Sequence, residues 1–429
     1  MEEIKNPEIK EARIAIIGLG YVGLPLAIEF GKKFPTIGFD INPERIDQLN
    51  EANDLTNEVS KEDLIKSDLL FSTKIESLNE CNVFIITVPT PVDKKKVPNL
   101  FPIESATKAI GSVLKRNDIV IYESTVYPGL TEEICAPILE KISGLKYNLD
   151  FFCGYSPERI NPGDRNHTIT EIVKVTSGST PEIAQYVDEL YKTIIPAGTF
   201  MAKDIKTAEA AKVIENTQRD VNIALINELS IVFDALNLDT KHVLEAAQTK
   251  WNFLPFKPGL VGGHCIGVDP YYLTHKSVAE GYKPEMILSG RKINDDMPSF
   301  IVSKIEKLMS VRDIDITLSN ILILGFTFKE NCPDYRNTKV IDLYKGLTKK
   351  AANVDVYDPW PNRSQIKKDF NLNLVEVLTE DNYDGVIHAV DHSIFKELYE
   401  SGIEKYCKSN YIIFDVKHSL PESMITSRL

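Results

Sequence analysis

The sequence predicts an α/β protein with two doubly wound domains joined by a central all-helical domain that contains one long helix. Short apolar runs alternate with helical patterns up to about residue 203 and again from about residue 313, which is typical of sheets covered by helices. Between these regions, a helical stretch without glycine or proline runs from residue 204 to residue 236. We therefore expect domains at residues 1–203, 204–312 and 313–429.

Within the two α/β regions, short apolar runs mark the expected strands. In the first region they are residues 13–17, 36–40, 83–88, 119–122 and 151–154, with a helix at 24–32. In the second region they are residues 321–326, 354–357, 385–390 and 411–416, with a helix at 340–349. The alternation predicts a parallel sheet in each region.

The central region carries one long apolar stripe. Its members recur at helical spacing and are Ile214, Val221, Leu225, Leu229, Val232 and Leu236. Helical patterns continue through residues 272–296, after a loop rich in proline and glycine at 254–267. Because the stripe is long for one side of one helix, we expect a second copy of the chain to cover it in a twofold homodimer, although a neighbour in the same chain could also do so.

A polar row lies opposite the stripe on the same helix. Lys212, Asn216 and Arg219 are spaced at i, i+4 and i+7 and share one face. Such a row is most often a solvated helix face. Beside a substrate it would instead supply an ammonium, an amide and a guanidinium, which are suitable donors for a developing oxyanion.

Composition and charge narrow the class of partner. The chain has 429 residues, 43% of them hydrophobic, and a formal net charge of −13. The negative charge argues against nucleic acid or an anionic membrane as a bulk partner. The charged first residues contain no apolar signal core, and no apolar run approaches the ~20 residues that span a bilayer. We therefore expect a cytoplasmic protein.

The six cysteines form no C-x-x-C pair, so the sequence predicts neither a zinc site nor a disulfide framework. His388 and His392 lie four residues apart, but His388 falls in a strand-like run. Strand geometry does not present both side chains as a helix face would, and we expect no metal site there.

A glycine-rich turn between the first strand and the first helix predicts dinucleotide binding. It has the pattern G-x-G-x-x-G, with the cofactor-binding candidates Gly18, Gly20, Tyr21, Val22 and Gly23. The glycines allow a tight turn, close approach of a pyrophosphate and close packing of helix on strand, as in a Rossmann-like domain. A purely structural glycine turn is the alternative.

Asp40 ends the next strand, 22 residues after Gly18. A carboxylate there accepts hydrogen bonds from the ribose hydroxyls of NAD and repels the 2′-phosphate of NADP. Arg45 lies nearby as a further cofactor-binding candidate and leaves the choice between NAD and NADP open.

Cys265 stands in a loop with Gly262, Gly263 and Gly267 around it. Flanking glycines leave a sulfur accessible and let a substrate approach. A buried packing cysteine is the commonest fate of a free thiol, and from this segment alone the two interpretations remain equally good.

Seven segments together resemble the UDP-glucose/GDP-mannose dehydrogenase family, in order and spacing, over roughly residues 13–420. They are residues 18–23, 88–91, 124–126, 156–160, 212–216, 262–269 and 325–336. Within the family, residues 157–163 and 263–272 resemble the branch that acts on UDP-N-acetylglucosamine for surface polysaccharides such as capsule, Vi antigen and O-antigen. The resemblance implies an oxidoreductase with NAD as cofactor and a UDP-sugar as substrate.

The resemblance implies a role for each matching residue. The catalytic set is Cys265 as nucleophile, Lys212 and Asn216 as oxyanion donors, Glu158 with Thr125 at an acid/base water, and Asp269 in support of Lys212 or the hydrolytic water. Thr90 and Thr125 would line the nicotinamide, and Arg336 would reach towards the NAD phosphates. The nucleotide-sugar would be held by Arg159, Ile160, Lys212, Asn216, Arg219, Lys250, Gly262, Phe328, Lys329 and Lys417.

Two positions depart from neighbouring branches. Pro162 replaces an acidic residue of the UDP-glucose branch, and Lys250 stands where related enzymes acting on N-acetylmannosamine have an arginine. UDP-glucose, UDP-N-acetylmannosamine and GDP-mannose remain alternative substrates. Two other classes of protein are also considered. A two-electron hydroxyacid dehydrogenase would need neither Cys265 nor a second α/β domain. A non-catalytic NAD sensor would not need the catalytic Cys, Lys and Glu to be intact.

The implied reaction takes a primary alcohol to a carboxylate and removes four electrons, so it uses two NAD. A thiolate adds to the intermediate aldehyde, the thiohemiacetal gives up a second hydride, and the thioester is hydrolysed. Adjacent cations such as Lys212 would favour the thiolate.

Overall fold

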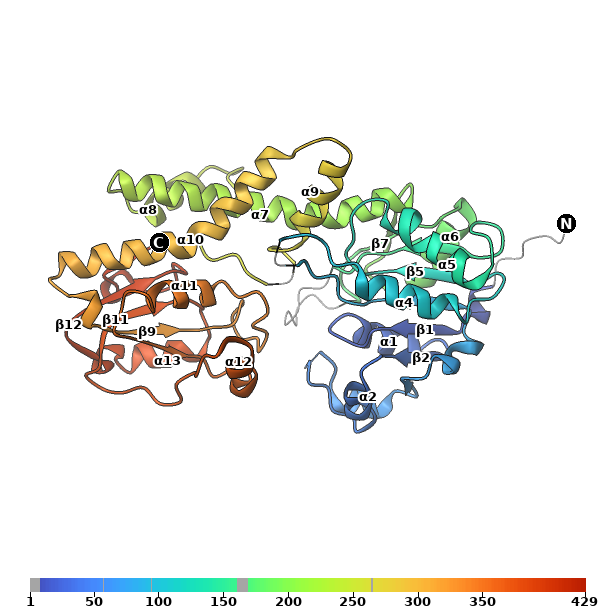
Figure 1. The fold of residues 1–429 in the computed structure, drawn as a ribbon, viewed down its shortest axis with the longest axis horizontal. Coiled ribbons are helices and arrows are strands. Elements are labelled where there is room, and N and C mark those ends of the chain that lie inside the picture. The colour runs from blue at the N-terminus through green and yellow to red at the C-terminus, as the bar shows by residue number, and fades with distance from the viewer. Residues whose placement is uncertain (1–7, 57, 94, 160–168, 264) are drawn as a thin grey trace. The chain divides into compact units, whose positions relative to one another are not determined.

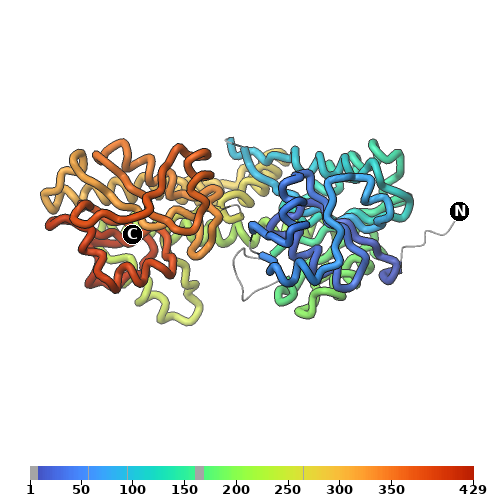
Figure 2. The backbone as a smooth tube through the Cα atoms, turned by 90° about the horizontal axis from the view of Figure 1, so that it is seen from below, coloured from blue at the N-terminus to red at the C-terminus, as the bar shows by residue number. Residues whose placement is uncertain are grey.

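The computed structural model describes residues 8–56, 58–93, 95–159, 169–263 and 265–429. The chain divides into two compact units, residues 1–215 with 271–282 and residues 216–270 with 283–429. The path of the chain can be followed from blue to red in Figures 1 and 2. Among the described residues, every helix is too short or too polar to cross a bilayer.

The amino-terminal unit is built on a six-stranded parallel sheet in the order β3-β2-β1-β4-β5-β6. The strands are β1 (Ile14–Ile17), β2 (Thr36–Phe39), β3 (Leu70–Ser72), β4 (Val83–Ile86), β5 (Ile119–Tyr122) and β6 (Phe152–Tyr155). β1, β4, β5 and β6 are buried along their whole length, which explains why each is a continuous apolar run. The strand order reverses between β1 and β4, where doubly wound sheets bind ligands at their carboxyl ends.

Helices cover this sheet, and Ile16 of β1, Leu26 of α1 and Tyr191 of α6 share one buried core. The helices are α1 (Gly23–Gly31), α2 (Pro43–Asn50), α3 (Lys61–Lys66), α4 (Phe101–Gly111), α5 (Ala136–Ser143) and α6 (Pro181–Lys192). Single turns occur at η1 (Ile9–Glu11), η2 (Ile75–Glu80) and η3 (Thr131–Cys135). A further pair of parallel strands, β7 (Lys174–Thr176) and β8 (Thr199–Met201), was not predicted from the sequence.

The predicted long helix is α7 (Ile205–Ala235), followed by α8 (Thr240–Gln248), α9 (Asp269–Ala279) and α10 (Glu285–Val311). The helical patterns at 272–296 therefore belong to two helices. Gly281 adopts a positive φ of 87° directly after α9, a conformation that ends a helix and suits glycine.

The apolar stripe of α7 is not a core face within this chain. Leu225 is 53% exposed and Leu236 is 60% exposed. The side of α7 that packs in the carboxyl-terminal unit carries Asp220, Ala224 and Asn227, all buried. This packed face combines hydrogen-bonded polar side chains with apolar ones, and the covering of the stripe by a second copy stays a prediction.

A second parallel sheet follows in the order β10-β9-β11-β12-β13. Its strands are β9 (Asn320–Leu324), β10 (Asn353–Tyr357), β11 (Tyr383–His388), β12 (Cys407–Asp415) and β13 (Ser427–Arg428). The remaining elements are α11 (Val340–Leu347), α12 (Arg363–Phe370), α13 (Ile394–Glu400), η4 (Ile316–Leu318), η5 (Ile403–Tyr406) and η6 (Glu422–Met424).

Both faces of the second sheet are covered. Ile323 packs with α10 and α11 in one core, whereas Leu322 packs with Phe395 of α13 in another, on the opposite face in Figure 1. β9, the first strand of this sheet along the chain, lies between β10 and β11. The sheet therefore extends in both directions from β9, which is a doubly wound arrangement with its switch point between β9 and β11. The predicted fold class is confirmed.

Candidate active site

The glycine-rich turn after β1 has the geometry that dinucleotide binding requires. A Cβ on Gly23 would lie 1.8 Å from the carbonyl oxygen of Gly18, so helix and turn pack closely only with glycine there. A Cβ on Gly20 would meet no atom within 4 Å, which leaves the backbone open to a phosphate. Tyr21 and Val22 are half-buried beside it. These residues fit the pyrophosphate of NAD.

Asp40, directly after β2, is fixed beside this turn. Its carboxylate accepts the backbone N–H of Leu19 at 2.8 Å and that of Asn42 at 2.9 Å. The position is the one from which a carboxylate contacts the ribose hydroxyls of NAD.

The side chain of Arg45 is buried and forms hydrogen bonds with other groups of the protein. Its Nε donates to the carbonyl of Leu19 at 2.8 Å, and its Nη2 pairs with Asp54 at 2.8 Å. Asp54 also accepts the backbone N–H of Thr56 and Val59. Arg45 thus braces the glycine-rich turn, and a direct contact with NAD stays a prediction.

Thr90 and Thr125 lie in the loops after β4 and β5, on the same carboxyl edge of the sheet, and both are half-buried. The Ser124 hydroxyl donates to the carbonyl of Val88 at 2.7 Å and ties the two loops together. The Tyr155 hydroxyl of β6 donates to the carbonyl of Ser124. The two threonines are therefore held on neighbouring loops, as the nicotinamide side of the site requires.

Glu158 follows β6 and is buried against a lysine that the sequence analysis did not select. Lys174 Nζ lies 3.3 Å from Glu158 and 2.6 Å from Glu123, which is fully buried. The carboxylate of Glu158 also accepts the backbone N–H of Arg159 at 2.6 Å. No sequence spacing reveals this group, because its members come from different strands. Lys174 begins β7, a strand that was not predicted, so no sequence signal marked this residue.

Arg159 is held by Glu215 at 2.9 Å and by the carbonyl of Val173 at 2.8 Å. Its side chain is 30% exposed, and contact of Arg159 with a substrate stays a prediction. Ile160, the next predicted substrate-binding residue, lies outside the described residues.

Two of the predicted catalytic side chains are in direct contact. Asn216 Nδ2 donates to Asp269 Oδ2 at 2.6 Å, which joins α7 to the first residue of α9. Lys212 precedes Asn216 by one turn of α7 and is buried, whereas Arg219 is exposed.

Cys265 differs from every other thiol of the chain. All six cysteines are described, and five are buried while Cys265 is half-buried. Burial raises the pKa of Cys81 to about 11 and those of Cys135 and Cys407 to about 12, which keeps these thiols protonated and inert. The buried-packing interpretation therefore does not apply to Cys265.

The loop that carries Cys265 is shaped by glycines and anchored at both ends. A Cβ on Gly262 would lie 2.7 Å from the carbonyl of Asn337, and Gly263 has a φ of 81°. Further upstream, Asn227 of α7 donates to the carbonyl of Gly259 at 3.0 Å and accepts its N–H at 2.8 Å. Downstream, the Cys265 carbonyl accepts the N–H of Asp269 at 2.8 Å.

A small open pocket lies at the switch point of the second sheet. Its lining comes from the loops after β9, β11 and β12 and from the Cys265 loop: Leu260, Gly262, Thr327, Phe328, Thr338, Lys339, Val340, Ala389, Val390 and Lys417. Three predicted substrate-binding residues, Gly262, Phe328 and Lys417, thus meet in one pocket. The charge of Lys339 in its wall is balanced by Asp295 at 2.9 Å and Asp342 at 3.1 Å.

The other predicted residues of this unit do not line that pocket. Lys329 is half-buried in the loop after β9, and Lys250 is exposed after α8. Arg336 forms a two-point pair with Asp334, with Nη2 at 2.6 Å, and its side chain is 49% exposed. Their contacts with NAD or substrate stay predictions.

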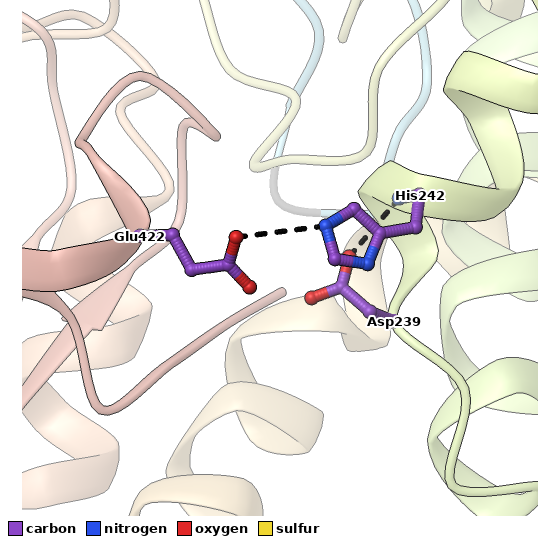
Figure 3. Close-up of side chains that lie close together, drawn as sticks. All are labelled: Asp239, His242 and Glu422. Atoms are coloured by element: carbon purple, nitrogen blue, oxygen red, sulfur yellow. Dashed lines mark hydrogen bonds and ion pairs between the residues drawn. The ribbon is translucent and has the colours of Figure 1, made fainter.

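One cluster in the carboxyl-terminal unit combines residue types that bind metals: Asp239, His242 and Glu422 (Figure 3). Arg428 already supplies a cation there, since its guanidinium lies 2.8 Å from Asp239 and 3.5 Å from Glu422. The cluster is therefore an ion-pair group that ties β13 to the start of α8.

Comparison with known proteins agrees with this geometry. Three sequence models of the UDP-glucose/GDP-mannose dehydrogenase family match in succession: the NAD binding domain at residues 12–195, the central domain at 206–296 and the UDP binding domain at 322–422.

Two relatives that match over almost their full length share more than half of their residues with this chain. The chain is 55% identical to a UDP-N-acetyl-D-glucosamine 6-dehydrogenase of Pseudomonas aeruginosa, over 98% of this chain and 100% of that protein. It is 53% identical to a protein of the same name from Salmonella typhi, over 98% and 99%. Among solved structures, a UDP-D-ManNAc dehydrogenase from Pyrococcus horikoshii superposes with a TM-score of 0.87 at 30% identity, over 96% of each chain.

Proposed function

Because the chain belongs to the UDP-glucose/GDP-mannose dehydrogenase family, we propose that it oxidises the C6 hydroxyl of UDP-N-acetylglucosamine to the uronic acid with NAD. The observation that carries the proposal is the half-buried Cys265, in a loop that joins a nucleotide pocket to the Asn216–Asp269 pair. Full-length identity of 55% and 53% to two dehydrogenases of that substrate favours UDP-N-acetylglucosamine over the other nucleotide-sugars.

In the proposed reaction, NAD held by the glycine-rich turn and Asp40 would supply the hydride acceptor for each of two oxidations. Glu158, through water and with Thr125, takes the proton of the C6 hydroxyl. The Cys265 thiolate then adds to the aldehyde, and Lys212 and Asn216 donate to the oxyanion. After the second oxidation, water cleaves the thioester, and Asp269 orients that water or the donors beside it.

Binding is divided between the two units. In the amino-terminal unit, the glycine-rich turn, Asp40 and Thr90 hold NAD. In the carboxyl-terminal unit, Gly262, Phe328 and Lys417 hold the UDP moiety, with help from Lys329. The proposal also includes contacts with NAD by Arg45 and Arg336. It includes contacts with the nucleotide-sugar by Arg159, Ile160, Arg219 and Lys250.

The exposed stripe on α7 supports a homodimer, since a second copy of the same helix offers a matching apolar face. We also propose a cytoplasmic enzyme, whose six thiols stay reduced, and a product used for surface polysaccharides.

The test is an NAD-reduction assay over UDP-glucose, UDP-GlcNAc, UDP-GalNAc, UDP-ManNAc and GDP-mannose, with product analysis. The proposal expects the highest kcat/KM with UDP-GlcNAc and two NADH for each uronic acid formed. One NADH for each product would identify a two-electron dehydrogenase. NAD binding without turnover on any of the five would identify a sensor.

A further inference from the structure

Beneath Glu158 lies a group of three buried charges from three different elements. Lys174 of β7 places its ammonium 2.6 Å from Glu123, which follows β5, and 3.3 Å from Glu158, which follows β6. The side chains of Glu123, Lys174 and Glu158 are 0%, 3% and 11% exposed. One cation therefore serves two carboxylates away from water.

Further contacts fix the orientation of each member. The Tyr191 hydroxyl of α6 donates to Glu123, and the Lys174 ammonium lies 5.4 Å from the centre of the Tyr191 ring. Glu158 is held at both oxygens, by Lys174 and by the backbone N–H of Arg159. A buried carboxylate held at two points has few alternative rotamers, so its position depends on Lys174.

The group can hold two charge states near neutral pH. Burial raises the pKa of Glu123 to about 7, against the lowering effect of Lys174. Burial alone would lower the pKa of Lys174, but the two carboxylates raise it, so the ammonium stays charged. With Glu123 protonated, Lys174 pairs with Glu158 alone. With Glu123 ionised, the ammonium is shared.

We propose that Lys174 is the positioning residue of Glu158. The charge on Glu123 then determines how much of the positive charge of Lys174 remains to balance the carboxylate of Glu158. The inference rests on the proposed acid/base role of Glu158. Lys174 is itself almost fully buried, so it acts through Glu158 rather than on the substrate. A merely structural ion pair in the same place would support folding without affecting the orientation or charge of Glu158.

The experiment compares Glu123→Gln with the double variant Glu123→Gln/Lys174→Met. Lys174→Met alone leaves two buried carboxylates without a cation and can unfold the unit, whereas the double variant removes one charge of each sign. Loss of the ammonium should move the acidic limb of the kcat/KM profile up by about one pH unit and lower kcat by at least about tenfold, with the KM for NAD unchanged. Lys174→Arg should restore most of the rate.

Lys192→Met is the matched control, because Lys192 pairs with Asp188 at 2.6 Å on the exposed side of α6 in the same unit. It should leave the profile unchanged. If the double variant has the profile shape of Glu123→Gln and loses rate only in proportion to its unfolded fraction, Lys174 is structural and the inference is overturned.

A measurement without turnover separates this inference from the proposed function. Infrared difference spectra against Glu158→Gln report the protonation of Glu158 directly as pH is varied. The signal of the protonated carboxyl should persist to higher pH in the double variant than in Glu123→Gln. If it does so while no nucleotide-sugar is oxidised, the proposed function fails and the positioning role stands. An identical titration in both proteins would overturn the positioning role, whatever the activity.

Discussion

The side-chain amide of Asn216 donates to the carboxylate of Asp269 at 2.6 Å, and Asp269 is 2% exposed. The pair joins α7, which carries the predicted oxyanion donors, to the residue that also caps the Cys265 loop through its N–H. The hydrogen bond to Asp269 fixes the orientation of the Asn216 amide and therefore the direction of its second N–H. This donor is thus preorganised before a charge develops on the substrate.

Asn216→Ala should therefore lower kcat by roughly 10²–10³-fold, the usual effect of losing one oxyanion donor. It should also lower the free energy of unfolding by about 1–3 kcal/mol, because Asp269 loses a partner while buried. Steady-state kinetics and urea unfolding measure the two effects. Asn222→Ala, on the same helix, is the control and should change neither.

The carboxylate of Asp40 should make the enzyme prefer NAD to NADP. It is held by two backbone N–H groups beside the glycine-rich turn and cannot readily move away from a 2′-phosphate. The electrostatic conflict costs on the order of 1–3 kcal/mol, or about a tenfold to hundredfold difference in kcat/KM. Equal kcat/KM for the two cofactors would contradict this role of Asp40.

Stability should depend on pH through buried Glu209. Its carboxylate accepts the N–H groups of Gly129 and Thr131, and burial raises its pKa from 4.5 to about 7. A raised pKa means that the folded state holds the proton more tightly than the unfolded state. The contribution of Glu209 to the free energy of unfolding is complete below about pH 4.5 and is lost as pH rises through 7.

Glu209→Gln cannot ionise and should remove this part of the pH dependence. Between pH 5 and 8, Tm of the wild type should fall relative to Tm of the variant, by an amount that corresponds to at most about 3 kcal/mol. Calorimetry at matched ionic strength measures it. Parallel Tm curves for the two proteins would show that Glu209 does not titrate in this range.

The stripe on α7 should be the dimer contact. Leu225→Glu places a charge on an apolar face that a second copy is proposed to cover, so it should shift the protein towards the monomer. Light scattering at micromolar concentration measures the mass. Leu55→Glu, at an equally exposed leucine outside the stripe, should leave the dimer intact. A wild-type mass of 48.3 kDa would refute the dimer.

Local patterns explain which parts of the site were predictable. Gly23 and Asp40 belong to one strand–helix–strand unit, in which spacing along the chain fixes spacing in the fold. Lys174 and Glu123 are 51 residues apart and meet only in the folded unit, so no spacing along the chain predicts their contact. The position of Arg45 after Asp40 predicts a place near NAD, which stays a prediction, but its pairing with Asp54 was not predictable because the loop of Asp54 has no sequence signature.

Cys265→Ser should be defective chiefly in the second oxidation or in product release. Serine keeps the size and polarity of the residue, so folding and NAD binding should survive. A serine hydroxyl ionises far less readily than a thiol, so the hydroxyl adds poorly to the aldehyde. An ester, if formed, would hydrolyse more slowly than a thioester and trap the enzyme covalently.

The first oxidation requires a base and a placed nicotinamide but not Cys265, so the variant should still yield up to one NADH per active site. Lys212→Ala should instead slow both oxidations, by roughly 10²–10³-fold, because it removes a charge beside both oxyanions. Rapid-quench NADH yield together with intact-mass analysis distinguishes the two. Cys81→Ser, at a buried thiol, is the control for the substitution itself. If Cys265→Ser formed the uronic acid at the wild-type rate over many turnovers, Cys265 could not be the nucleophile, because every product molecule must pass through the thioester in the proposed mechanism.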